Sequence, residues 1–171
     1  MKKFSATITR KNIFILIRYS GLTLEEFGNI IGLSKRWVQY VKEGKYDFDI
    51  PSIEKASNFF NVPFIKLTTT IVTPSFGYRK MLEAYHKNNT EYSKILSEPP
   101  SIPYLIEFIL MKDSEFTTRT EMEIRDIRKI ISKYDLDYKG SSLSTELQKS
   151  DFVEFWPHPT KNRTNLYRAK I

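Results

Sequence analysis

The chain has 171 residues, which is enough for one ordinary domain or two small ones, and its 40% hydrophobic and 27% charged residues are typical of a folded globular protein. It has no cysteine and only two histidines, His86 and His158, which excludes thiolate catalysis, disulfides and cysteine-based zinc sites. We therefore predict neither an enzyme nor a bound cofactor or metal. No run approaches the ~20 apolar residues of a membrane helix, and no signal-peptide pattern is visible, so we expect a cytoplasmic protein without contact to a membrane.

The formal net charge of +7 is concentrated in the N-terminal part of the chain. Residues 1–73 contain 11 basic and 6 acidic residues, whereas residues 74–100 and 101–171 each carry a net charge of only +1. Prolines at the two junctions interrupt the periodic sequence, because proline lacks an amide donor for a helix. We therefore predict a first domain over residues 1–73, a helical connector over residues 74–100 and a second domain over residues 101–171.

Apolar periodicity predicts five short helices in the first domain. Thr23, followed by Glu26, has the pattern of a capping box, and Ser34 is the expected N-cap of the next helix. Asp49 or Ser52 is expected to cap the fourth helix. The inward positions of the third helix are predicted at Trp37, Val38 and Val41, with Trp37 packing at the edge of the core. In the connector, the same reasoning predicts two short helices joined by a polar turn at residues 88–90.

The second domain has a different pattern. Helices are predicted over residues 103–112, about 120–134 and 142–149. Two strands, 152–156 and 164–171, follow and are separated by a turn that contains His158 between two prolines. Three helices followed by a hairpin resemble a winged helix, so the predicted fold class is mainly α, with a small β-hairpin at the C-terminus.

Residues 22–44 carry the motif on which the functional prediction depends. The segment LTLEEFGNIIGLSKRWVQYVKEG places Gly28 where two helices would approach each other and Gly32 in the turn between them. This segment resembles the helix-turn-helix of the lambda repressor and Cro (XRE-type) family, and the resemblance extends over residues 9–68. The family commonly has alanine where Gly28 stands and glutamate where Lys42 stands.

The resemblance implies that the helix over residues 34–43 enters the major groove of double-stranded DNA. Arg36 and Gln39 are then the candidates for reading bases, because a guanidinium matches the acceptors of guanine and an amide matches adenine. The wider set of expected DNA contacts, which includes phosphate contacts that fix the register, is Thr23, Ser34, Lys35, Arg36, Gln39, Tyr40, Lys42 and Lys45.

A second DNA contact is expected in the winged-helix-like domain. Its candidate residues are Ser144, Thr145, Gln148 and Lys149 on the third helix, and Lys161 and Arg163 at the tip of the wing. A net charge of +1 gives this domain a weak electrostatic footprint, so dimerisation or binding of a regulatory protein is the alternative role.

These observations together predict a sequence-specific transcriptional regulator of bacterial, phage or plasmid origin, which acts by binding and functions as a homodimer on two half-sites. Two alternatives remain open. In the first alternative, the chain is a two-domain DNA-binding accessory protein of replication or of a phage. In the second, it is a protein-interaction module that binds a host factor, through either the helical domain or the residues Phe155, Trp156 and Tyr167.

Overall fold

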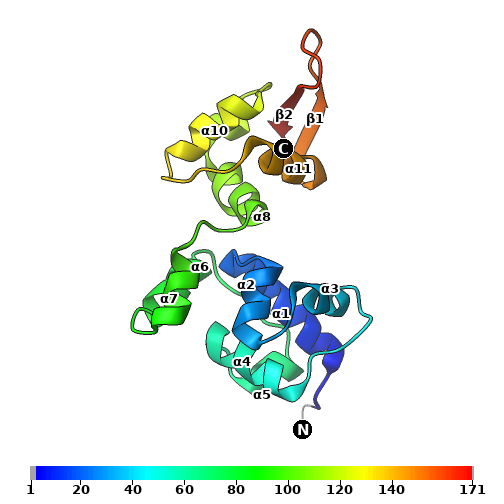
Figure 1. The fold of residues 1–171 in the computed structure, drawn as a ribbon, viewed down its shortest axis with the longest axis vertical. Coiled ribbons are helices and arrows are strands. Elements are labelled where there is room, and N and C mark those ends of the chain that lie inside the picture. Colours follow the sequence, from blue (N-terminus) through cyan, green and yellow to red (C-terminus); the bar gives the residue numbers. More distant parts are fainter. Residues whose placement is uncertain (1–2, 171) are drawn as a thin grey trace. The chain divides into compact units, whose positions relative to one another are not determined.

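The computed structural model describes residues 3–170 and divides into two compact units, Met1–Pro100 and Ser101–Ile171 (Figure 1). Most described residues lie in helices, and one two-stranded antiparallel sheet lies in the second unit. The prediction of a mainly α fold with a C-terminal hairpin is confirmed at this level.

Five helices open the first unit, as the periodicity predicts: α1 (Ala6–Ser20), α2 (Leu24–Ile31), α3 (Lys35–Lys42), α4 (Ile50–Phe60) and α5 (Phe64–Thr69). The N-caps predicted at Thr23 and Ser34 are confirmed. The Thr23 hydroxyl accepts the Glu26 amide at 3.1 Å, while the Thr23 amide donates to the Glu26 carboxylate at 2.6 Å. Of the two candidate caps for α4, Asp49 is the cap, because its carboxylate accepts the Ser52 amide at 2.9 Å.

The segment predicted as a connector forms α6 (Tyr78–Tyr85) and α7 (Thr90–Ser97), and it packs on the first core. Tyr78, Leu82 and Leu96 lie in the same buried cluster as the apolar residues of α1, α2 and α4. Burial of these apolar faces is favourable, and α1 and α4 supply the nearest apolar surface. The helices of residues 74–100 are therefore part of the first unit.

A buried guanidinium ties α6 to its neighbours. Arg79, with only 6% of its surface exposed, donates to the carbonyl oxygens of Ser20, Leu96 and Glu98, each at 2.7 Å. These carbonyls lie at the C-terminal ends of α1 and α7, where a helix leaves its acceptors without partners. One charged side chain thus satisfies acceptors from two helices, which favours a fixed arrangement of α1, α6 and α7.

The second unit begins with a continuous helical segment, α8 (Ile102–Tyr104), η1 (Leu105–Ile109) and η2 (Leu110–Lys112). A short helix, α9 (Ser114–Thr118), was not predicted, because it buries a single large apolar residue, Phe116, and shows no periodicity. It is followed by α10 (Ile124–Ser132) and α11 (Gly140–Lys149).

The predicted start of the α10 helix at about residue 120 was wrong. Met122 forms an isolated antiparallel bridge with Tyr167, so the chain is extended there. Glu123 then caps α10, with its amide donating to the Asp126 carboxylate at 3.1 Å. A long-range backbone pairing therefore replaces the first turn that local periodicity suggested.

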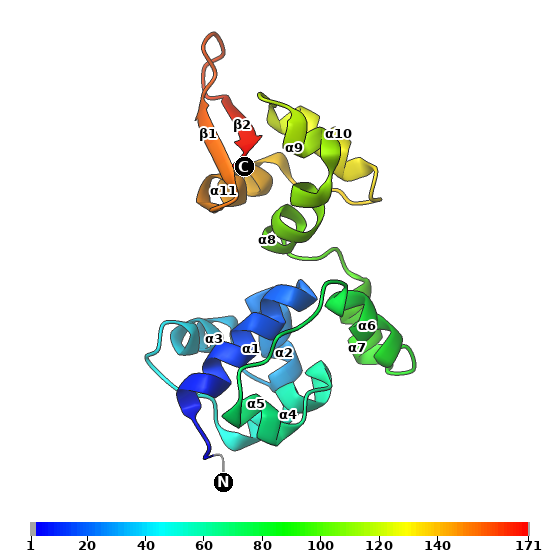
Figure 2. The same ribbon diagram turned by 180° about the vertical axis from the view of Figure 1, so that it is seen from behind.

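The hairpin consists of β1 (Val153–Pro157) and β2 (Asn165–Ala169), and its register places Phe155 opposite Tyr167. Tyr167 is fully buried against the helices of this unit. In both views of the ribbon, the loop of the hairpin extends away from α11 (Figures 1 and 2).

Candidate nucleic-acid interface

The connection between α2 and α3 uses glycine for two different reasons. Gly32 ends α2 with φ at 80°, in the left-handed region that other residues adopt only with strain. Gly28 lies inside α2, where an added Cβ atom would stand 2.4 Å from the Leu33 carbonyl oxygen. The Leu33 amide also donates to the Gly28 carbonyl at 2.8 Å. This close approach fixes the direction in which the chain enters α3.

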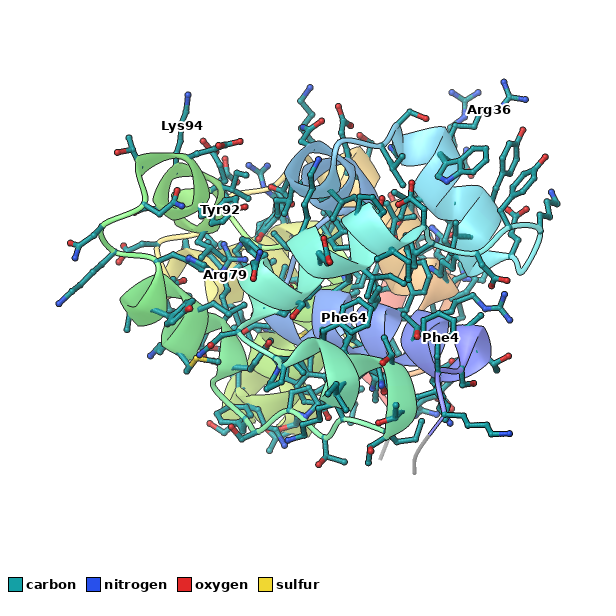
Figure 3. All side chains as sticks on the ribbon, turned by 90° about the horizontal axis from the view of Figure 1, so that it is seen from below. Phe4, Arg36, Phe64, Arg79, Tyr92 and Lys94 are labelled. Atoms are coloured by element: carbon teal, nitrogen blue, oxygen red, sulfur yellow. The ribbon has the colours of Figure 1, made fainter. Side chains whose placement is uncertain are left out.

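One face of α3 is buried and the opposite face is exposed. Val38 and Val41 have no exposed surface and hold the helix on the core of the first unit. Lys35 and Arg36 are exposed, and Gln39 and Tyr40 are partly exposed. Figure 3 shows the Arg36 side chain pointing away from the helices into solvent. The predicted base-reading residues therefore lie on accessible surface.

The sequence pattern predicted Trp37 as an inward residue, and this prediction was wrong. It is 38% exposed, and its ring stacks on Tyr46 with the centroids 4.5 Å apart. Successive residues of a helix are rotated by about 100°, so Trp37 lies to one side of the buried Val38. Trp37 packs on the segment that follows α3, at the margin of the exposed face.

The exposed face of α3 has its own hydrogen bonds. The Arg36 Nε atom donates to the Tyr40 hydroxyl at 2.6 Å, and the guanidinium lies 5.4 Å from the centre of the Tyr40 ring. The Lys45 ammonium lies 4.9 Å from the same ring. Tyr40 thus holds two cations beside it, and the three groups form one positively charged aromatic cluster.

Glu43 is a residue of this face that the sequence analysis missed. Its carboxylate accepts from the Gln39 amide at 2.9 Å and pairs with the Lys45 ammonium at 2.6 Å. The hydrogen bond from Lys45 lowers the pKa of Glu43, and the same contact raises the pKa of Lys45. An anion that approaches Gln39 or Lys45 meets the negative charge of Glu43 beside them.

The other predicted contacts lie at different places around α3. Thr23 and Ser34 are exposed at the starts of α2 and α3, where their hydroxyls accept backbone amides. Lys42 is exposed on the flank of α3 that faces α1, away from Arg36. There it borders a hollow whose lining includes Arg10, Lys11 and Arg18 of α1. The sequence analysis did not single out these three cations, although Lys11 and Arg18 are seven positions apart and so lie on one face of α1.

The residues predicted for a second DNA contact form two separate groups. On α11, the Ser144 hydroxyl lies 2.7 Å from the Tyr167 hydroxyl, and the Gln148 amide donates to Ser144 at 2.9 Å. Thr145 is exposed on the same helix and donates to a backbone carbonyl of its own helix. These polar groups are thus engaged with the protein itself.

The predicted cations of the second unit already have acidic neighbours or stand apart from α11. Lys149 pairs with Glu146 at 3.1 Å, and Lys161 pairs with Glu123. The hydrogen bond from Lys161 lowers the pKa of Glu123. Arg163 is exposed in the hairpin loop, where it adopts φ of 58°. The structure does not bring the residues of the loop together with those of α11.

Within residues 3–170, no cluster of three or more histidine, aspartate and glutamate side chains has the arrangement of a metal site. None of the helices in this range combines the length and the apolar character needed to cross a membrane. Comparison with models of known protein families found no match, and neither curated proteins nor solved structures showed significant similarity to the chain.

Proposed function

We propose that the protein is a sequence-specific DNA-binding transcriptional regulator, in which α2 and α3 form a helix-turn-helix of the lambda repressor and Cro type. The proposal is carried by one observation: α3 is held on the core by Val38 and Val41 while it presents Arg36, Gln39 and Tyr40 outward. A helix that presents a long cation and an amide on its exposed face matches the donor and acceptor pattern of the major groove.

In this proposal Arg36 reads a guanine through its O6 and N7 atoms. The bond from Arg36 to Tyr40 leaves other guanidinium N–H groups available for a base, because arginine has five of them. Gln39 reads an adjacent base after it leaves Glu43, whose negative charge would otherwise face the phosphates. Lys35 and Lys45 contact the backbone, and the capped N-termini of α2 and α3 help to fix the register.

One small module makes few base contacts, so we propose that the protein binds as a homodimer on two half-sites about one helical turn of DNA (~34 Å) apart. A regulator of bacterial, phage or plasmid origin would act in the cytoplasm, where its DNA is accessible. Its activity would consist of binding without turnover, and it would need no cofactor.

We propose a winged-helix-like arrangement for the second unit, in which α11 and the hairpin follow the shorter helices. Its hairpin loop carries Lys161 and Arg163, which supports a contact to phosphates or to the minor groove. In the free protein Lys161 pairs with Glu123, and this ion pair competes with a contact between Lys161 and a phosphate. The alternative role for this unit is to bind a protein, and it is supported by Phe155, which is 44% exposed on the hairpin.

Selection of binding sites from random duplex DNA, followed by titration of the selected site at several salt concentrations, tests the proposal. We expect a defined consensus, a marked decrease of affinity with salt, and a loss of about 1–3 kcal/mol with relaxed specificity at one base for Arg36→Ala. Lys94→Ala on α7 is the matched control, since Lys94 is exposed at the opposite end of the first unit from α3 (Figures 1 to 3).

The same titration separates the roles of the second unit. If the loop contacts DNA, Arg163→Ala lowers the affinity for all sequences and reduces the salt dependence. If the hairpin binds a protein, Arg163→Ala leaves DNA binding unchanged. Enrichment of no sequence, or a consensus that Arg36→Ala does not affect, would contradict the proposed reading by α3.

A further inference from the structure

A surface hollow lies between α1 and the C-terminal end of α3, which are neighbours in both views (Figures 1 and 2). Its volume is about 400 Å³. Phe14 and Ile15 of α1 form its apolar floor, and they are only partly buried. These two side chains are the apolar members of the lining, which otherwise consists of Thr7, Arg10, Lys11, Arg18 and Lys42.

Four cations surround this floor. Arg10, Lys11 and Arg18 come from α1, and Lys42 comes from α3. The lining contains no carboxylate. Within the described range, Lys11 and Lys42 have no ion pair or side-chain hydrogen bond, and Arg10 has a single long contact of 3.4 Å with the exposed Asp47. Among the described residues, the charges of Lys11 and Lys42 are therefore not compensated by an acidic side chain.

The combination of charge and apolar floor restricts the ligand. Like charges on a surface repel one another, so an anion that enters the hollow gains attraction and relieves this repulsion. A phosphate group satisfies the cations and leaves Phe14 and Ile15 uncovered. A peptide with carboxylates on either side of an apolar side chain fits the cations as well as the floor. Its carboxylates pair with the cations, and its apolar side chain covers Phe14 and Ile15 and removes them from water.

The hollow is also separate from the proposed base-reading face. Lys42 follows Arg36 by six residues, which places the two side chains about 120° apart around α3. Arg36 points into solvent (Figure 3). Lys42 lines the hollow together with residues of α1. A ligand in the hollow therefore does not require the surface that carries Arg36 and Tyr40.

We propose that the hollow formed by α1 and α3 is a docking site for an acidic segment of a partner protein, in which an apolar side chain inserts on Phe14 and Ile15 between carboxylates that pair with Lys11 and Lys42. This inference does not depend on DNA binding by α3. It assigns to the first unit a protein-binding surface on the flank of α3.

The test uses the full chain and a short fluorescent peptide in which glutamate alternates with leucine. Fluorescence anisotropy is expected to show binding that weakens as salt is added. Lys42→Glu and Lys11→Glu are each expected to weaken it by about tenfold, because an attractive contact becomes repulsive. Lys94→Glu makes the same charge change on α7 and is expected to leave binding unchanged.

Two further peptides test the wild-type protein without any substitution. A peptide with glutamine in place of glutamate lacks the charge, and one with serine in place of leucine lacks the apolar groups. We expect both to bind at least tenfold more weakly than the glutamate–leucine peptide. Equal binding of the glutamine peptide would show a purely apolar surface, and equal binding of the serine peptide would show a general anion site. Either result overturns the proposal.

Binding of double-stranded DNA by the same variants distinguishes the docking site from the DNA-binding surface. If Lys11→Glu weakens binding of a duplex of random sequence as strongly as it weakens binding of the peptide, the hollow belongs to the DNA footprint and the proposal is wrong. If Arg36→Ala weakens selective DNA binding while peptide binding is unchanged, the two surfaces are independent, as proposed. If DNA does not bind at all but the peptide does, the DNA-binding function fails and the docking site stands.

Discussion

The Nε atom of Arg36 donates a hydrogen bond of 2.6 Å to the hydroxyl of Tyr40, one turn further along the exposed face of α3. The contact holds the guanidinium in one direction before any ligand arrives. Because ordering a long side chain on binding costs about 0.5–1.5 kcal/mol, a guanidinium that is already oriented binds more tightly. Tyr40 therefore acts on DNA affinity through Arg36 as well as directly.

Tyr40→Phe tests this coupling, since it removes the hydroxyl and keeps the ring. We expect the affinity for the selected duplex to fall by about 1 kcal/mol, because Arg36 must then be ordered during binding. In an Arg36→Ala background the same substitution is expected to have a smaller effect. Titration of the four proteins of this cycle measures the coupling, and equal effects of Tyr40→Phe in both backgrounds would show that the two residues act separately.

Gly28→Ala is expected to destabilise the first unit. Alanine is favoured over glycine inside a helix by up to about 1 kcal/mol, but here its Cβ atom would meet the Leu33 carbonyl oxygen at 2.4 Å. Relief of such a clash by backbone shifts typically costs about 1–3 kcal/mol, so we expect the melting temperature to fall by several degrees. Circular dichroism during heating measures it. Asn29→Ala, at the exposed neighbouring position, is the control, and an increase in Tm for Gly28→Ala would contradict the close approach of α2 and α3.

Arg79→Met is expected to lower the free energy of unfolding by about 2–4 kcal/mol, because it leaves buried carbonyl groups of Ser20 and Leu96 without their donor. Methionine retains much of the side-chain volume, so the loss reports on the polar contacts. Denaturation by guanidinium chloride measures the change. The exposed neighbour provides the control Lys80→Met, which we expect to be within about 0.5 kcal/mol of the wild type. Similar values for the two variants would show that the Arg79 contacts do not hold α6 and α7 in place.

The second unit is expected to lose stability in acid through Asp113. Burial alone would raise the pKa of this carboxyl, but hydrogen bonds from the Tyr134 hydroxyl and the Phe116 amide, together with the Lys133 charge, lower it below its ordinary value of 3.8. A carboxyl with a lowered pKa in the folded state stabilises the fold above its unfolded pKa, and this contribution is lost as the pH falls through the folded pKa. The loss is therefore expected below about pH 4.

Asp113→Asn removes this titration. At neutral pH we expect the variant to be less stable than the wild type. The neutral amide has a single acceptor oxygen for the Tyr134 hydroxyl and the Phe116 amide, and it carries no negative charge beside Lys133. The difference is expected to shrink as the pH falls below about 4 and the wild-type carboxyl becomes protonated. Urea denaturation over a series of pH values measures both quantities, with Asp151→Asn as an exposed control. A difference that stays constant with pH would mean that the charge of Asp113 does not stabilise the fold.

Local patterns were sufficient for most helices of the chain. Thr23 with Glu26, and Ser34 before an apolar run, marked the starts of α2 and α3, because a helix N-terminus needs acceptors for its free amides and these side chains supply them. The left-handed Gly32 was predictable for a similar reason, since glycine tolerates this conformation. These signals depend only on neighbours within a few residues, so the sequence alone contains them.

Elements controlled by distant contacts were not predictable in the same way. The start of α10 was wrong because Met122 pairs with Tyr167, far along the chain, and α9 was missed because Phe116 gives no repeating pattern. Trp37 was expected at the edge of the core, yet it stacks on Tyr46, a residue outside its helix. In each case a tertiary contact decided between alternatives that local sequence leaves equal.

The candidate site shows the same division. For Lys35, Arg36, Gln39 and Tyr40, the exposed side of α3 was predictable from sequence, because the buried positions Val38 and Val41 fix the orientation of an amphipathic helix. What lies around those residues came only from the structure: Glu43 pairs with Lys45, and the cations of α1 meet Lys42 around an apolar hollow. Helix periodicity assigns a side chain to a face, but the packing of helices determines which two faces come together.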